Sequence, residues 1–61
     1  MKVNVYRLND NKLAKSYKNI ESVIISFGEN ENQYVIRYND HGIEKIARYY
    51  THIYIIESFN D

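Results

Sequence analysis

The sequence predicts an all-β domain, a small antiparallel meander of about five to six short strands. Val, Ile and Tyr gather in short runs, which is typical of strands because β-branched and aromatic side chains pack well on a pleated surface. Polar clusters rich in Asn, Asp and Gly separate the runs and indicate turns.

Four runs are predicted as strands, and they cover residues 2–8, 21–27, 33–39 and 52–58. Three polar clusters separate them. The cluster 9–11 consists of residues that tolerate the left-handed conformation. The cluster 28–32 is a flexible polar loop, and Gly42 at the end of the cluster 39–42 can take the positive φ of a short hairpin turn.

The middle segments 11–20 and 43–50 fit two patterns. Their apolar residues can form the stripe of an amphipathic helix, and these residues are Leu13, Ala14, Tyr17, Ile43, Ile46, Ala47 and Tyr50. The same segments can form half-buried strands that close hairpins. Helices would give the order β-α-β-β-α-β of a miniature ferredoxin-like fold, but parallel crossovers need about a dozen or more residues. The meander is therefore the favoured prediction.

The chain is expected to form one domain over residues 1–61. A chain of about 60 residues buries only about 60% of the surface that its unfolded form exposes, so it supports a single thin core. The two halves 1–27 and 33–61, joined by the loop 28–32, share a similar order of residues around an Asn-Asp pair and suggest an internal duplication. Since the chain has no cysteine, no disulfide can reinforce the core, and self-association is the remaining route to extra stability.

Alternation within the strands predicts a core, and its expected members are Val5, Val23, Ile25, Ile36, Ile53 and Ile55. The runs 21–27 and 52–58 are apolar on both faces, so neither leaves a clean water-facing side. We expect a second copy of the chain to cover the extra face in a symmetric homodimer. The candidate self-association face consists of Ile24, Val35, Tyr54 and Ile56.

Charge is balanced over the whole chain but uneven along it. Residues 1–20 carry five basic side chains and one acidic side chain, whereas the rest carries three basic and seven acidic ones. This balance argues against indiscriminate binding to phosphates. The basic first third still offers a candidate nucleic-acid platform of interleaved basic and aromatic residues, namely Tyr6, Arg7, Lys12, Lys15, Tyr17 and Lys18.

Seven tyrosines are unusual in so short a chain. Tyrosine combines a large stiff ring with a polar tip, and it is favoured both in strands and at protein interfaces. The candidate residues for contact with a protein partner are Tyr34, Tyr38, Tyr49 and Tyr50.

Catalysis and metal binding are not expected. His41 and His52 are the only imidazoles, and neither lies in a metal-ligand motif. No serine, threonine or lysine has a recognised nucleophile context, and Gly28 and Gly42 are isolated rather than part of a phosphate-binding loop. We therefore expect no enzyme activity and no cofactor.

No segment has the apolar run of about 18 residues that a membrane span needs, and the first residues lack the apolar region of a secretory signal. A cytoplasmic protein without membrane contact is expected. In its size, its abundance of Lys, Asn, Ile and Tyr, and its lack of Cys, Pro and Trp, the chain resembles small orphan proteins encoded by phages and mobile elements of low-GC Gram-positive bacteria.

The resemblance implies a non-enzymatic protein that binds and redirects a host protein, such as a component of an antiviral defence system. Such a protein would act in the cytoplasm of the host cell. The alternative from the residues themselves is a small nucleic-acid-binding or regulatory module that uses the basic first third. A structural component of a virus particle is a third function class compatible with this composition.

Overall fold

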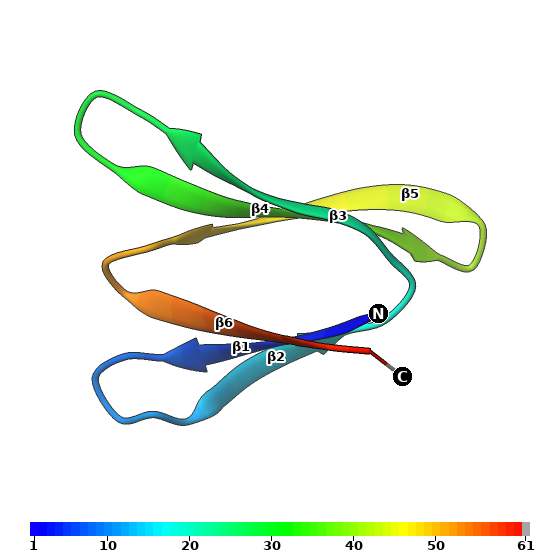
Figure 1. The fold of residues 1–61 in the computed structure, drawn as a ribbon, viewed down its shortest axis with the longest axis horizontal. Coiled ribbons are helices and arrows are strands. Elements are labelled where there is room, and N and C mark those ends of the chain that lie inside the picture. The colour runs from blue at the N-terminus through cyan, green and yellow to red at the C-terminus, as the bar shows by residue number, and fades with distance from the viewer. Residues whose placement is uncertain (61) are drawn as a thin grey trace.

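The computed structural model describes residues 1–60 and contains strands but no helix within that range. The strands are β1 (Lys2–Arg7), β2 (Leu13–Tyr17), β3 (Ile20–Phe27), β4 (Asn32–Asp40), β5 (Ile43–Tyr50) and β6 (Tyr54–Phe59) (Figure 1). The all-β prediction is confirmed. The middle segments form β2 and β5, so the helical alternative is wrong. The turns before β2 and β5 are tight. Asn11 and His41 adopt the left-handed conformation there, which lets the chain reverse direction within a few residues.

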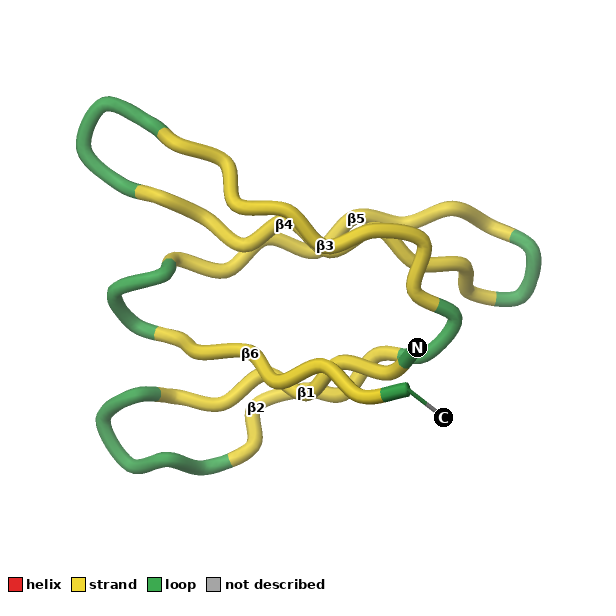
Figure 2. Tube along the Cα trace, in the orientation of Figure 1, coloured by secondary structure: helices red, strands yellow, loops and turns green. Residues whose placement is uncertain are grey.

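The six strands form two three-stranded antiparallel sheets that lie face to face (Figures 1 and 2). Sheet A has the order β2-β1-β6, and sheet B has the order β3-β4-β5. The chain passes between the layers twice, after β2 and after β5, so the strands follow one another as a meander whose last strand returns to pair with the first. The chain's own two sheets cover each other's inner faces, including Tyr54 and Ile56, whereas Ile24 stays exposed; the homodimer stays a prediction.

The turns depend on residues that accept a positive φ or a close approach. His41 (φ 54°) and Gly42 (φ 83°) form the turn between β4 and β5, and the Asn39 side-chain oxygen accepts a hydrogen bond from the Gly42 N–H at 2.8 Å. Gly28 closes the β3–β4 hairpin, where its N–H donates to the Glu31 carbonyl at 3.1 Å. A Cβ atom at Gly28 would lie 2.6 Å from that carbonyl oxygen, so a side chain there would force the hairpin open.

The core lies between the sheets and is small, as the length predicted. Its buried members are Val3, Val5, Tyr17 and Ile36, and the partly buried side chains that pack against them are Ile20, Val23, Tyr38, Ala47, Tyr49, Tyr54 and Ile56. The core prediction is confirmed for Val5 and Ile36, and Val23 contributes in part.

The other three predicted core residues, Ile25, Ile53 and Ile55, are 43–46% exposed, so that part of the prediction is wrong. In β6 the phase is reversed, because Ile56 pairs with the inward-facing Val5 and Ile55 therefore points outward. Ile53 lies in the turn before β6. Ile25 lies toward the tip of the β3–β4 hairpin, which extends away from sheet A (Figure 1).

Four tyrosines form a row between the two layers, two from each sheet: Tyr17, Tyr38, Tyr49 and Tyr54. The Tyr17 ring lies 4.8 Å from the Tyr38 ring and 6.1 Å from the Tyr49 ring, and the Tyr49 and Tyr54 rings are 5.0 Å apart. The hydroxyl groups of Tyr17 and Tyr49 share a hydrogen bond. These large rings fill the interlayer space, and the hydroxyls of Tyr17 and Tyr49 satisfy each other, which suits a core with few aliphatic residues.

Candidate protein-binding site

The outer face of sheet B brings apolar and basic side chains together on three adjacent strands. Ile24 on β3 lies directly opposite Val35 on β4, and Val35 lies directly opposite Arg48 on β5. Arg37 on β4 lies opposite Ile46 on β5. We call these five residues, with Ser22 and Ser26 on β3, the sheet B patch.

The sheet B patch is a shallow depression of about 270 Å³. Val35 forms its floor and is only 6% exposed, although it points away from the core. Ile24 and Ile46 stand on either side of it and are 57% and 48% exposed. An apolar floor between two raised isoleucines can receive one apolar side chain from a partner.

Two arginines border the depression. The Arg37 Nε lies 3.9 Å from the Glu44 carboxylate, a long contact between two half-exposed side chains that holds little energy. The Arg48 Nη1 donates to the neutral Gln33 side chain at 3.5 Å, and no carboxylate within residues 1–60 pairs with Arg48. The patch is therefore basic at its border and suits a partner with acidic groups around an apolar centre.

The candidate self-association face does not exist as one surface. Ile24 and Val35 belong to the sheet B patch, but Tyr54 and Ile56 point from β6 into the space between the sheets. The run Tyr54-Ile55-Ile56 is apolar in either phase, so alternation could not decide which side faces in.

The four candidate partner-binding tyrosines also do not form one surface. Tyr38 and Tyr49 belong to the interlayer row, and Tyr34 lies on the same inner face of sheet B. Tyr50 lies on the outer face, 38% exposed, with its ring 5.7 Å from the His52 ring.

The candidate nucleic-acid platform is divided among separate places. Arg7 is bound to Asp10 at 2.8 Å, and Tyr17 is buried in the interlayer row. Tyr6 lies on the outer face of sheet A, where its hydroxyl donates to Glu57 at 3.4 Å and accepts from Asn4 at 3.2 Å. Lys12 follows the β1–β2 turn and does not line the cleft that holds Lys15 and Lys18.

Lys15 and Lys18 come together with Lys45 in a cleft of about 690 Å³ between the β2–β3 connection and the β4–β5 turn. The charge of Lys45 is already paired there, since its Nζ donates a hydrogen bond to the Asp40 carboxylate at 2.7 Å. Hydrogen bonds from Lys45 and His41 lower the pKa of Asp40, and the bond to Asp40 raises the pKa of Lys45. Two lysines therefore remain to bind an external anion in this basic cleft.

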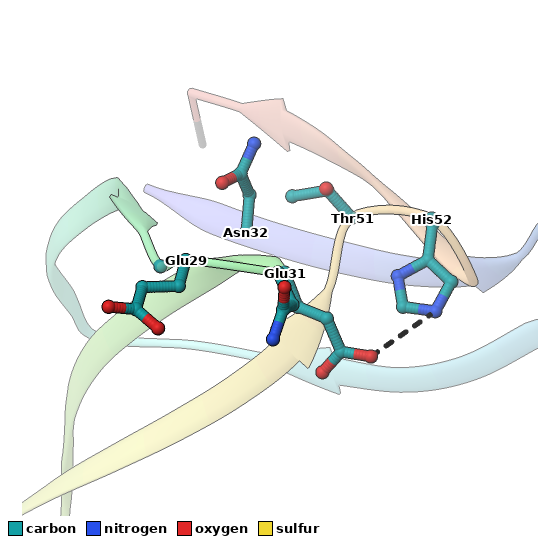
Figure 3. A pocket seen from close by; sticks show the side chains of 7 residues that line it. Glu29, Glu31, Asn32, Thr51 and His52 are labelled. Carbon is teal, nitrogen blue, oxygen red and sulfur yellow. Dashed lines mark ion pairs between the residues drawn. The ribbon is translucent and has the colours of Figure 1, made fainter.

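A further pocket of about 350 Å³ lies where the β3–β4 loop meets the β5–β6 turn (Figure 3). His52 Nε2 lies 3.9 Å from the Glu31 carboxylate, while the Glu29 carboxylate is turned away from this pair (Figure 3). Within residues 1–60 no group of three or more His, Cys, Asp or Glu side chains is placed to hold a metal ion. The absence of catalysis and of a metal cofactor stays a prediction.

Sequence reasoning missed five of the seven members of the sheet B patch, namely Ser22, Ser26, Arg37, Ile46 and Arg48. The alternation of side chains along a strand could have identified Ile46 and Arg48. If residues 43–50 form a strand, these two residues lie on one face. Arg37 shares a face with Val35 in the same way.

Comparisons with known proteins found no matching family model, no matching curated protein and no matching solved structure. Among the described residues, no helix has the length and apolar character needed to cross a membrane.

Proposed function

We propose that this domain is a non-enzymatic protein-binding module that covers a surface of a host protein with its sheet B patch. The observation that carries the proposal is the exposure of Ile24 and Ile46 on either side of Val35, bordered by Arg37 and Arg48. Exposed apolar side chains that adjoin one another on a small domain mark interaction sites, and arginine is enriched in such sites.

The mode of action that fits this patch is occlusion. The depression is too shallow to enclose a small substrate, but three strands provide a stable platform that can lie flat on a protein surface. A small protein of a phage or mobile element that blocks a host defence component would act in this way, in the host cytoplasm. A partner surface with an apolar side chain surrounded by carboxylates would complement the patch.

Replacing Ile46 with Asp should abolish capture of the partner. The change puts a negative charge beside the apolar floor and opposes the expected acidic surface. The measurement is affinity capture from a low-GC Gram-positive lysate followed by mass spectrometry. Ile55→Asp is the matched control, because Ile55 is 45% exposed on the outer face of sheet A. A protein captured by the parent and Ile55→Asp but lost with Ile46→Asp would support the proposal, and equal capture by both variants would contradict it.

The basic cleft favours a second candidate function, nucleic-acid binding. Lys15 and Lys18 line the cleft, and no carboxylate within residues 1–60 pairs with either. If this function holds, single-stranded nucleic acid should bind with an affinity that falls steeply with salt, because bound phosphates release counterions. The double change Lys15→Glu and Lys18→Glu should then remove binding, whereas Ile46→Asp should not. Fluorescence anisotropy over a range of salt concentrations makes the test, and no binding at low salt would reject this function.

A further inference from the structure

The strand β3 has an open edge whose backbone groups can be assigned from the ladder it forms with β4. The Gly28 N–H bonds to the Glu31 carbonyl, and hydrogen-bonded pairs recur at every second residue of an antiparallel ladder. Ser26, Ile24 and Ser22 therefore direct their N–H and C=O groups toward β4. Val23, Ile25 and Phe27 direct theirs toward the open edge.

An independent bond gives the same assignment. The Thr51 N–H donates to the Asn32 carbonyl at 3.0 Å, which turns Asn32 toward β5. Its neighbour Gln33 must then face β3, where it is paired with Ser26.

This edge lacks the protection that strands at sheet edges usually have. Natural edges are protected by charged side chains, especially lysine, and by proline. In β3 the only charged side chain is Glu21 near its start, and the six residues Ser22–Phe27 contain neither charge nor proline. By contrast, β2 carries Lys15, β5 carries Glu44, Lys45 and Arg48, and β6 carries Glu57.

The side chains at this edge are also exposed on both faces of the hairpin. Phe27 is 79% exposed and Ile25 is 46% exposed on the inner face, while Ile24 on the outer face is 57% exposed. A neutral apolar strand of this kind pairs readily with another strand.

We propose that a second copy of the chain pairs with this edge, β3 against β3 in antiparallel orientation, with the two-fold axis at Ile25. Both strands are uncharged over Ser22–Phe27, so no like charges face each other within that length; Glu21 and the partner's Glu29 lie beyond it. In this register Ile25 faces the partner's Ile25, and Phe27 faces the partner's Val23. Apolar side chains in such cross-strand positions stabilise the pair.

A two-fold pairing through β2 would instead place Lys15 beside its own symmetry copy. The pairing through β3 joins the two B sheets into one six-stranded sheet and covers the β3 edge of both copies, while the β5 edges stay open. It also places two sheet B patches on the same side of that sheet, so it extends the surface of the proposed function without depending on it.

Replacing Ile25 with Pro tests the pairing. Proline removes the N–H that faces the open edge and leaves the β3–β4 hydrogen bonds in place, so the domain should still fold. Ile46→Pro is the matched control, because its N–H faces the open edge of β5 and Ile46 is similarly exposed. Sedimentation equilibrium should show the parent and Ile46→Pro approaching twice the 7.3 kDa chain mass at high concentration. For Ile25→Pro the dimer dissociation constant should rise by about tenfold or more. The substitution removes one backbone hydrogen bond from each copy, and therefore two from the symmetric dimer.

Hydrogen exchange on the parent protein tests the same edge without any substitution. The amides of Val23, Ile25 and Phe27 should become more protected as concentration rises, while those of Ile46 and Arg48 should not. A parent protein that stays monomeric at all concentrations, or a dimer that leaves the β3 edge amides unprotected, would overturn the proposal. This readout does not involve a host partner, so its failure would leave the proposed function untouched.

Discussion

Replacing Ile36 with Ala is expected to remove a large part of the domain's free energy of unfolding at 25 °C. Ile36 lies at the centre of β4, is fully buried, and packs in the cluster that includes Val3, Val5 and Tyr17. Removing its outer carbons costs about 2 to 5 kcal/mol, through lost burial and the cavity left behind. A folded domain of this length has a stability of roughly 0.1 kcal/mol per residue, so this loss removes a large part of the total. Urea unfolding followed by circular dichroism measures the change.

Ile55→Ala is the control for this experiment. Alternation in the sequence placed Ile55 in the core, but it is 45% exposed on the outer face of sheet A. Its replacement should cost only about 1 kcal/mol, since roughly half of its apolar surface is already in water. Equal destabilisation by the two substitutions would contradict the assignment of Ile36 to the core and of Ile55 to the surface.

The strands and turns could be predicted because their signals are local. Runs of β-branched and aromatic residues end at polar clusters, and a turn such as His41-Gly42 needs residues that accept a positive φ. The division of these strands into two layers could not be predicted in the same way. It depends on the pairing of β1 with β6, which joins the two ends of the chain.

The candidate site was only partly predictable for the same reason. Alternation predicts Ile24 and Val35 on one face, and they do lie opposite each other. Tyr54 and Ile56 were assigned to the same face because β6 is apolar in both phases, and only its pairing with β1 turns Ile56 inward. Lys15 and Lys18 do line one cleft, but Arg7 forms a local ion pair that its spacing from Asp10 allows.

The second large effect is a loss of folding stability at high pH, and Tyr17 causes it. Burial between the sheets and the hydrogen bond with Tyr49 raise the pKa of Tyr17 above its ordinary value of 10.0. The unfolded chain ionises this phenol at its ordinary pKa, whereas the folded chain keeps it protonated. The contribution of Tyr17 to stability is therefore complete below pH 10 and is lost as the pH rises toward the folded-state pKa. The loss is about 1.4 kcal/mol for each pH unit above 10.

Tyr17→Phe should reverse the order of stability between neutral and alkaline pH. At pH 7 the variant should be less stable than the parent by about 1 kcal/mol, because it loses the hydrogen bond with Tyr49 but keeps the ring contacts. As the pH rises above 10 the parent loses stability through Tyr17 and the variant does not, so their unfolding curves should cross. Urea midpoints measured at a series of pH values show the crossing.

Tyr49→Phe shows whether burial or hydrogen bonding is the main cause of the raised pKa of Tyr17. It removes the same hydrogen bond, but Tyr17 stays buried, and burial is the larger reason for its raised pKa. This variant should therefore keep most of the alkaline loss of stability that Tyr17 causes, while Tyr17→Phe abolishes it. A stability difference between the parent and Tyr17→Phe that stays constant from pH 7 to above pH 10 would show that Tyr17 ionises freely in the folded protein. The tyrosine row would then not form the closed interlayer core described above.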